Sequence, residues 1–426
     1  MNSLKGGVVP RVGLNYVTVG RTAEIDALLR DVEMIAEGGA SFRFIVGKYG
    51  SGKSFLLQTI RNYVMAKNFV VVDADLSPER RLQGTRGQGL ATYKELIRNM
   101  STKTRPEGGA LSLILDRWIS SVQQQVLSES DLSPTDPALQ KLVEKRISAV
   151  ICSLNEMVHG FDFARLLTLY YQAYCSDDDE TKAKVLKWFR GEYTTKTEAR
   201  AELGVGIIIT DDDWYEYLKL FAAFLKQAGY AGMLVLIDEL VNIYKIPNAI
   251  TRQYNYEKIL TMYNDAMQGK AHHIGFLLGG TPQCMEDPRR GVYSYEALRS
   301  RLAEGHFSGE HKDLLSPVIR LLPLTNEEML ILIEKLADIH AGLYEYQQIV
   351  TQQDMVDFIQ MEFGRIGADS HITPREVIRD FIEVLDIVYQ NPQVKVRELL
   401  GSDQFHYAQN AVLEETAGGS FAEFEI

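Results

Sequence analysis

The sequence lacks the features of membrane, secreted and zinc-binding proteins. None of its 426 residues lies in a run of about 18 consecutive apolar residues, the length that a membrane helix needs. Met1–Pro10 has no apolar segment of the kind found in secretory signals. The three cysteines, Cys152, Cys175 and Cys284, show no metal-ligand spacing, and His272-His273 has no third ligand nearby. We therefore expect a cytoplasmic protein with reduced thiols and no membrane contact.

A net positive charge is also missing, since 45 Lys and Arg stand against 57 Asp and Glu, giving a net charge of −12. Proteins that coat nucleic acid unaided usually carry a positive field, so this balance argues against that class. One local stretch is basic, however, and could contact DNA phosphates independently of sequence. Its cations are Arg80, Arg81, Arg86, Lys94, Arg98, Lys103 and Arg105. The alternative is an ordinary solvated loop.

Short apolar runs that end in turn-forming or acidic residues are the main indication of the fold. They lie at residues 42–46, 69–72, 233–237, 274–278 and, more weakly, 318–322. Runs this short, separated by helical patterns, are typical of strands buried on both faces of a parallel sheet. The sequence therefore predicts an α/β protein with a doubly wound core.

The spacing of the runs predicts the domain organisation. Residues 91–228 show a 3.6-residue apolar period and are too long for one crossover, so we expect a helical insertion. The core then consists of residues 1–90 and 229–315, followed by a helical unit at 316–400. Residues 401–426 are acidic and contain glycine, which favours a flexible tail.

A phosphate-binding loop is predicted directly after the first apolar run. Residues 47–54, Gly-Lys-Tyr-Gly-Ser-Gly-Lys-Ser, fit G-x-x-x-x-G-K-[ST], the Walker A motif. Its glycines allow backbone N–H groups to surround a phosphate, and the following helix directs its positive end at the anion. We expect Lys53 on the β- and γ-phosphates of ATP and Ser54 on Mg²⁺. The predicted nucleotide contacts are Gly47, Lys48, Tyr49, Gly50, Ser51, Gly52, Lys53, Ser54 and Phe55.

The third apolar run supplies the acidic partner of this loop. Leu-Val-Leu-Ile-Asp-Glu at residues 234–239 has the form of a Walker B strand. Asp238 would hold Mg²⁺, directly or through water, and Glu239 would orient and polarise the attacking water. The adjacent glutamate favours an active ATPase over a passive nucleotide binder.

These motifs resemble the AAA+ proteins of the origin-recognition and Cdc6-like branch. Val19-Gly20-Arg21-Thr-Ala-Glu-Ile precedes the P-loop as the V-G-R-x-x-E-[IL] box does in that branch, where the box lies against the adenine. The resemblance implies that Tyr16 to Gly20 contact the base, and we include Arg21 in the nucleotide site.

The same resemblance assigns further roles at the site. Thr281, after the fourth run, stands where that branch places the sensor 1 residue. Arg299-Ser-Arg301-Leu302 is similar to a box whose arginine reaches a neighbour's γ-phosphate, which implies a homo-oligomer; Arg301 is the first choice and Arg299 the second. Thr373-Pro-Arg375 is similar to sensor 2, so that Arg375 would touch the phosphates from a C-terminal lid.

A closer resemblance is to the BREX-system ATP-binding proteins often called the D component, from bacterial phage-defence clusters. The P-loop with its internal tyrosine carries it, together with Asp-Ala-Asp-Leu-Ser-Pro-Glu-Arg-Arg-Leu-Gln-Gly at 73–84 and Gly-Gln-Gly-Leu-Ala-Thr-Tyr-Lys-Glu-Leu-Ile at 87–97. The likeness extends from about residue 19 to 400. It implies an ATPase that works with a helicase or methylation partner on DNA.

Three functions remain open at this stage. The first is a DNA-associated ATPase in phage defence, and the second is an origin-recognition-like or transposition-regulator ATPase that loads another protein onto DNA. The third is a nucleotide-gated signalling scaffold whose slow hydrolysis only resets it. ATP turnover stimulated by DNA would favour the first two, whereas turnover raised only by a protein partner would favour the third.

Overall fold

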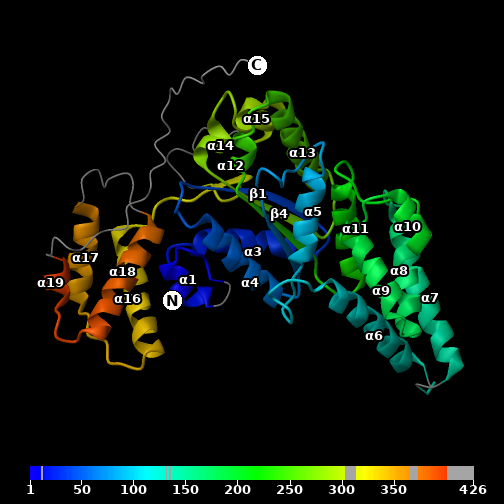
Figure 1. Ribbon diagram of the computed structural model, residues 1–426, viewed down its shortest axis with the longest axis horizontal. Helices are drawn as coiled ribbons and strands as arrows, with labels where there is room; N and C mark the ends of the chain where they lie inside the picture. Colours follow the sequence, from blue (N-terminus) through cyan, green and yellow to red (C-terminus); the bar gives the residue numbers. More distant parts are fainter. Residues whose placement is uncertain (11–12, 131, 134–135, 303–312, 365–372, 401–426) are drawn as a thin grey trace, which may run out of the picture. The chain divides into compact units, whose positions relative to one another are not determined.

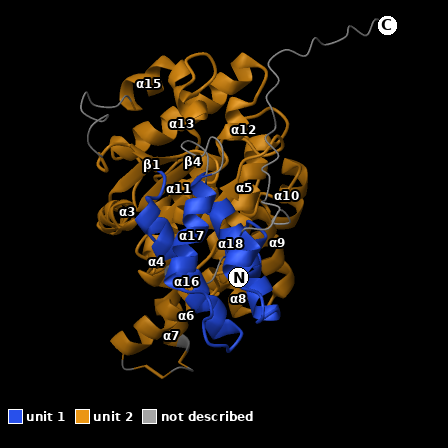
Figure 2. Cartoon of the chain, turned by 90° about the vertical axis from the view of Figure 1, so that its left-hand side faces the viewer, with its two compact units in different colours: residues 1–20, 323–426 blue, residues 21–322 orange. Residues whose placement is uncertain are grey.

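The computed structural model describes the chain except residues 11–12, 131, 134–135, 303–312, 365–372 and 401–426. The chain forms two compact units (Figure 2): unit 1 comprises Met1–Gly20 and Pro323–Ile426, and unit 2 comprises Arg21–Leu322. The predicted acidic tail lies outside the described residues. The functional division into core, insertion and lid remains a prediction.

Unit 2 is built on a five-stranded sheet in the order β2-β3-β4-β1-β5. The strands are β1 (Ala40–Val46), β2 (Val70–Asp75), β3 (Met233–Asp238), β4 (Ile274–Gly280) and β5 (Val318–Arg320). Every neighbouring pair is parallel. β4 therefore separates the strand that leads into the P-loop from the strand that ends at Asp238.

The strands form where short apolar runs can be buried on both sides of the sheet. This parallel sheet flanked by helices confirms the predicted α/β fold. All residues of β3 and β4 are buried. Several strands reach further than their apolar runs: β2 continues to Asp75, which lies opposite Asp238 in the register. The backbone ladder does not depend on side-chain polarity, so it extends into the polar residues at the carboxyl edge.

Helices cover both faces of this sheet (Figure 1). On one face, α3 (Thr22–Ala36) and α4 (Lys53–Ala66) bury Leu28, Val32, Ile60 and Val64 against the strands. The other face is covered by α5 (Gln88–Arg98), α11 (Trp214–Gln227) and α13 (Ala249–Met267). The buried side chains of these helices form the layers on the two faces of the sheet, as in other layered α/β cores.

The long segment between β2 and β3 is largely helical, as its apolar period predicts. After α5 come α6 (Leu111–Glu129), α7 (Pro137–Leu154), α8 (Gly160–Cys175), α9 (Asp179–Phe189) and α10 (Lys196–Leu203), followed by α11. Its core is aromatic: the Phe163 ring lies 5.1 Å from Phe221 and 5.0 Å from Phe189. These helices extend beside α11 in Figure 1.

The remaining elements of unit 2 follow the third and fourth strands. They are α12 (Val241–Tyr244), α14 (Pro282–Glu286), the 3-10 helix η1 (Val292–Ser294) and α15 (Glu296–Leu302). Among the described helices of the chain, none combines the length and apolar composition that a bilayer crossing requires.

Unit 1 joins the first residues of the chain to the last helices. It contains α1 (Asn2–Lys5), α2 (Leu14–Val17), α16 (Asn326–Leu343), α17 (Gln352–Gly364), α18 (Pro374–Gln390) and α19 (Val396–Leu400). Buried His340 links its helices, because Nε2 lies 3.1 Å from Asp386 Oδ1 and Nδ1 lies 2.8 Å from the Tyr346 hydroxyl. Lys5 of α1 pairs with the same Asp386, which ties the N-terminal helix to α18.

Candidate functional site

Two glycines turn the backbone of the loop between β1 and α4. Gly50 and Gly52 have φ values of 77° and 92°, in the left-handed region that favours glycine. α4 begins at Lys53, and its N-cap Gly52 provides no side-chain hydrogen bond to the first amides of the helix. A side chain on Gly52 would meet nothing within 4 Å. An open helix N-terminus of this kind suits a phosphate group.

Lys53 lies along the same loop. Its Nζ donates to the carbonyl oxygens of Gly47, at 2.9 Å, and Lys48, at 3.0 Å. The ammonium group is therefore held at the loop, where it can exchange carbonyl partners for phosphate oxygens. Tyr49, the residue inside the loop, has 66% of its surface exposed.

Ser54 and Asp238 meet across the sheet edge. The Ser54 hydroxyl donates to Asp238 Oδ2 at 2.6 Å, although the two residues are 184 positions apart in the chain. Asp238 is only 8% exposed, and its Oδ1 accepts the Glu239 N–H at 2.8 Å. Both oxygens of this buried carboxylate thus have fixed donors, which determines the orientation of the group.

Glu239 stands at the end of β3 in an unusual backbone conformation. Its φ of 62° is rare for a residue with a side chain and costs on the order of 1 kcal/mol. The Glu239 carbonyl accepts the Asn242 N–H at 2.9 Å, and the Asn242 side chain donates to the Leu76 carbonyl at 2.8 Å. These bonds hold the turn while the Glu239 side chain reaches solvent.

A carboxylate that the sequence analysis missed lies beside this pair. Asp75 ends β2 directly opposite Asp238. Desolvation by the surrounding protein, followed by the charges of Asp238, Asp73 and Glu239, raises the pKa of Asp75 to about 6. The doublet Asp73-Ala-Asp75 after an apolar run could have indicated it, because parallel strands bring their carboxyl ends to one edge.

Thr281 follows β4 at that edge and caps a helix. Its hydroxyl accepts the Cys284 N–H at 3.3 Å, and Cys284 Sγ accepts the Thr281 N–H at 3.1 Å. The two glycines before Thr281 hydrogen-bond to the segments that follow the neighbouring strands. The Gly280 carbonyl accepts the Gly47 N–H at 3.1 Å, and the Gly279 carbonyl accepts the Leu240 N–H at 3.0 Å. The β4 end is thus fixed between the P-loop and the turn after β3.

The arginines of α15 make contacts away from the P-loop. Arg301 donates through Nε to Asn264 Oδ1 at 3.0 Å and through Nη1 to the Ala297 carbonyl at 2.7 Å. The Arg299 side chain is 62% exposed and its ion pair with Glu296 is long, at 3.9 Å. Within the part of the chain that the structure describes, neither arginine bonds to a P-loop residue.

Residues predicted outside the P-loop core divide between the two units. Val19 and Gly20 belong to unit 1, and Arg21 belongs to unit 2, where its guanidinium contacts the P-loop backbone at the Ser51 carbonyl. Tyr16 is 72% exposed. Arg375 lies in the first turn of α18 in unit 1, near Gly7.

The donor set limits how a metal could be held. Among the described residues there is no group of three His, Cys, Asp or Glu side chains placed to bind a metal ion. His272 and His273 instead hydrogen-bond through Nδ1 to the Gly38 and Ile35 carbonyls, both at 3.1 Å. A Mg²⁺ ion at Ser54 and Asp238 would need phosphate and water oxygens for its remaining ligands.

The basic stretch is only partly neutralised by its neighbours. Arg80 pairs with Glu95 at 3.5 Å, and Arg98 reaches the same carboxylate at 3.8 Å. Arg86, Lys103 and Arg105 are exposed. Together with Arg98, whose side chain is 80% exposed, they are the cations of the stretch that a partner could contact most directly.

Comparison with known proteins adds a family to this geometry. A family model described as BREX system ATP-binding protein BrxC/D matches residues 1–404. No curated protein matches the sequence significantly. Because the family model spans nearly the whole chain, the chain belongs to this family of ATP-binding proteins.

Proposed function

We propose that this member of the BREX ATP-binding family is an AAA+ ATPase that hydrolyses Mg-ATP to regulate a DNA-acting partner complex in phage defence. The observation that carries the proposal is the 2.6 Å hydrogen bond from Ser54 at the start of α4 to Asp238 at the end of β3. It joins a phosphate-binding helix N-terminus to a buried carboxylate, the pair of elements that phosphoryl transfer requires.

The triphosphate would bind against the loop of residues 47–54. The amides at the start of α4 and the left-handed glycines would supply backbone donors, and Lys53 would supply a positive charge held at the loop. Binding would break the hydrogen bonds from Lys53 to the Gly47 and Lys48 carbonyls, and phosphate oxygens would replace these acceptors.

Magnesium fits the residues present. Ser54 and Asp238 offer a hydroxyl and a carboxylate oxygen, which are the ligands that this hard cation prefers. Desolvation raises the pKa of Asp75 most, and the negative charges of Asp238, Asp73 and Glu239 raise it further; a cation at this edge would relieve the second effect. Bound Mg²⁺ would neutralise charge that develops on the phosphate oxygens.

Hydrolysis would depend on Glu239. Glu239 directly follows Asp238, in a turn with a strained backbone, and it is exposed. Its carboxylate can therefore accept a hydrogen bond from a water molecule. A carboxylate in this position orients the water and increases its nucleophilicity. Strained backbone conformations that lower stability are found most often at functional residues, which agrees with a catalytic role for Glu239.

The remaining assigned residues would report on the nucleotide. Thr281 lies at the carboxyl edge of β4, and Arg375 would approach the phosphates from unit 1. Either Arg301 or Arg299 would complete the site of a neighbouring subunit in a homo-oligomer. The Arg299 side chain is 62% exposed, whereas Arg301 is already bonded to Asn264, and this difference in bonding favours Arg299 for contact with a partner.

The test is ATP hydrolysis by the purified protein, measured with Mg²⁺ or EDTA and with or without duplex DNA. We expect Mg²⁺-dependent turnover that falls at least about a hundredfold in Glu239→Gln, because the amide cannot act as a base. Glu156→Gln, at an exposed position of the helical insertion, serves as the matched control and retains turnover. Full activity of Glu239→Gln would remove the proposed role. Turnover that ignores DNA but rises with a protein partner would favour the signalling scaffold.

A further inference from the structure

The chain passes between the two units at two places. Unit 1 ends at Gly20 and resumes at Pro323, so the connections are Gly20–Arg21 and Leu322–Pro323. We call them the first and second connections. Contacts inside each unit hold these connections together, and inside unit 2 they also reach the P-loop.

Arg21 is the residue that links the connections in unit 2. It is 6% exposed, and its Nη2 donates to the Leu322 carbonyl at 2.8 Å and to the Ser51 carbonyl at 3.1 Å. Buried Glu24 lies 3.8 Å from Nη1 and balances the charge. One guanidinium group therefore bonds the start of unit 2, its last residue and the P-loop.

The second connection also touches the P-loop directly. The Leu321 N–H donates to the Val46 carbonyl at 2.7 Å, immediately before Gly47. A Cβ atom on Gly47 would lie 3.2 Å from Leu321 Cβ, so the Leu321 side chain lies close to the Gly47 backbone. A shift of the backbone at Val46 would reach Leu321 through their main-chain hydrogen bond.

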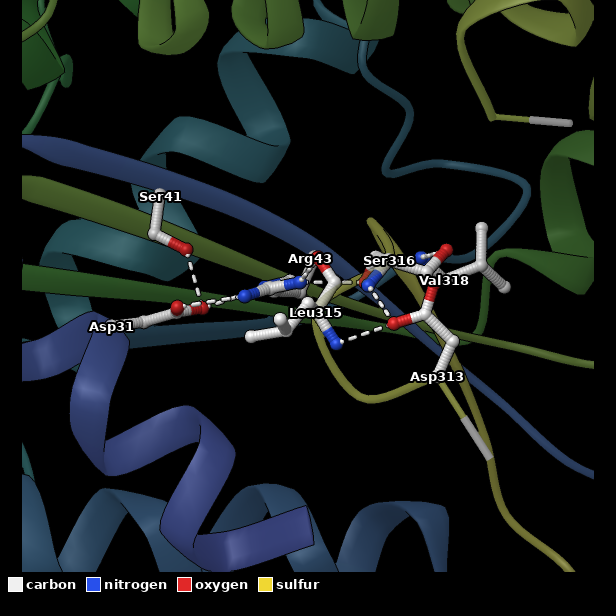
Figure 3. Close-up of polar contacts among 7 residues, drawn as sticks. All are labelled: Asp31, Ser41, Arg43, Asp313, Leu315, Ser316 and Val318. Carbon is white, nitrogen blue, oxygen red and sulfur yellow. Dashed lines mark hydrogen bonds and ion pairs between the residues drawn. The ribbon is translucent and has the colours of Figure 1, made fainter. Parts of the chain in front are cut away.

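The strand that leads to this connection is fixed at its beginning (Figure 3). Arg43 forms a two-point ion pair with Asp31, at 2.6 and 2.8 Å, and its Nη1 donates to the Leu315 and Ser316 carbonyls, both at 2.6 Å. The Asp313 carboxylate accepts the Leu315 and Ser316 N–H groups. The start of β5 is therefore anchored to β1 and α3 through Arg43.

Unit 1 packs the connections against each other in a second way. Gly20 has a φ of 67°, and a Cβ atom there would lie 2.6 Å from Glu328 Cδ and 2.9 Å from Leu324 Cδ2. Glu328 is itself held by the cap of α16, where its Oε2 accepts the Thr325 N–H at 2.8 Å. The first connection thus lies against the segment that follows the second.

We propose that Arg21 is a positioning residue that couples phosphate binding at the P-loop to both connections, an inference that rests on the proposed function. In a trans peptide the C=O and N–H point in opposite directions. By holding the Ser51 carbonyl, Arg21 directs the N–H of Gly52 to the opposite side of that peptide, where the loop can surround a phosphate. A phosphate that fixes this N–H would in turn fix the carbonyl, Arg21 and Leu322.

Amide hydrogen exchange with and without saturating Mg-ATP tests the coupling, with each variant at its own saturating concentration. In the parent protein we expect ATP to slow exchange about tenfold in the P-loop and in the peptides that cover residues 19–22 and 320–324. In Arg21→Ala the P-loop remains protected at saturation, but the connections lose their ATP response. Arg21→Lys gives an intermediate response, because an ammonium group cannot reproduce the planar geometry of guanidinium.

Arg30→Ala, an exposed arginine of α3, is the matched control and keeps the full response. A merely structural role would raise exchange equally with and without ATP, and a role only in nucleotide affinity would disappear at saturation. Connections that still respond to ATP in Arg21→Ala would overturn the inference. If ATP does not protect the P-loop of the parent protein, both the proposed function and the inference fail. If ATP protects the P-loop but exchange at the two connections does not change, only the coupling is refuted.

Discussion

Gly279 of β4 lies so close to Asp238 of β3 that a methyl group on its Cα would overlap Asp238 Oδ1. β4 is the strand between β3 and β1, so the Ser54–Asp238 hydrogen bond has to pass over its end. A glycine at this position leaves the space that the carboxylate occupies. The contact between the two Walker motifs therefore depends on a residue that belongs to neither.

We expect Gly279→Ala to displace Asp238 and to lower both stability and ATP affinity. Overpacking of a buried site typically costs about 1–3 kcal/mol in the free energy of unfolding. Chemical denaturation and calorimetric titration with Mg-ATP would measure the two effects. Gly342→Ala is the control, because a side chain there would meet nothing within 4 Å and alanine favours the helix. Equal stability of Gly279→Ala and the parent would show that Asp238 tolerates the added methyl group.

Ser54→Ala should raise the Mg²⁺ concentration needed for ATP binding about tenfold or more, since it removes one proposed oxygen ligand and leaves Asp238 Oδ2 without its donor. The measurement is the Mg²⁺ concentration needed for half-maximal binding of ATP. Ser54→Thr retains the hydroxyl and serves as the matched variant. If Ser54→Ala and the parent require the same Mg²⁺ concentration, the hydroxyl has no metal role.

Stability should respond to the protonation of His273. Burial lowers the pKa of His273 below its usual value near 6.5, so the unfolded chain binds this proton more readily than the folded chain. The free energy of unfolding is therefore unaffected well above pH 6.5 and decreases as the pH falls through 6.5 toward the folded pKa.

The comparison that isolates this effect is the parent protein against His273→Asn, by urea denaturation at pH 8 and pH 5.5. Asparagine tolerates the positive φ of 53° at this position. We expect the variant to lose less stability than the parent between the two pH values. An equal loss in both proteins would show that other groups account for the pH dependence.

DNA binding, if it uses the basic stretch, should depend on its exposed cations. Replacing Arg86, Lys103 and Arg105 with alanine removes three positive charges that the structure leaves at the surface. We expect weaker binding of duplex DNA and a salt slope reduced by about one per lost phosphate contact. Lys141, Lys145 and Lys196 of the insertion, changed together, control for net charge. If the salt slope is unchanged when Arg86, Lys103 and Arg105 are replaced, the basic stretch is an ordinary solvated loop.

The sheet could be predicted because its determinants are local. Each strand is a short apolar run that is buried on both faces, and the P-loop follows the first of them directly. The order of the strands in the sheet cannot be predicted from any single apolar run. The role of Gly279 therefore became visible only when β4 was found between β3 and β1.

Long-range contacts were the part that the sequence could not reveal. Asp75 was overlooked because its importance comes from the register with Asp238, across a separation that includes all the helices from α5 to α11. Arg21 was assigned to the nucleotide site on a sequence box, yet its guanidinium bonds to carbonyls 30 and 301 positions away. Residue type predicts a charge, whereas its partners depend on how distant segments meet.

Unit 1 combines the first twenty residues with segments that follow residue 322. During synthesis, α1 and α2 therefore leave the ribosome long before α16 and α18, the helices on which they pack. At translation rates of about 5–20 residues per second, the roughly 300 residues in between take on the order of 15–60 s. Throughout that interval the helices that α1 and α2 pack against have not yet been synthesised. A nascent-chain chaperone therefore has time to bind α1 and α2.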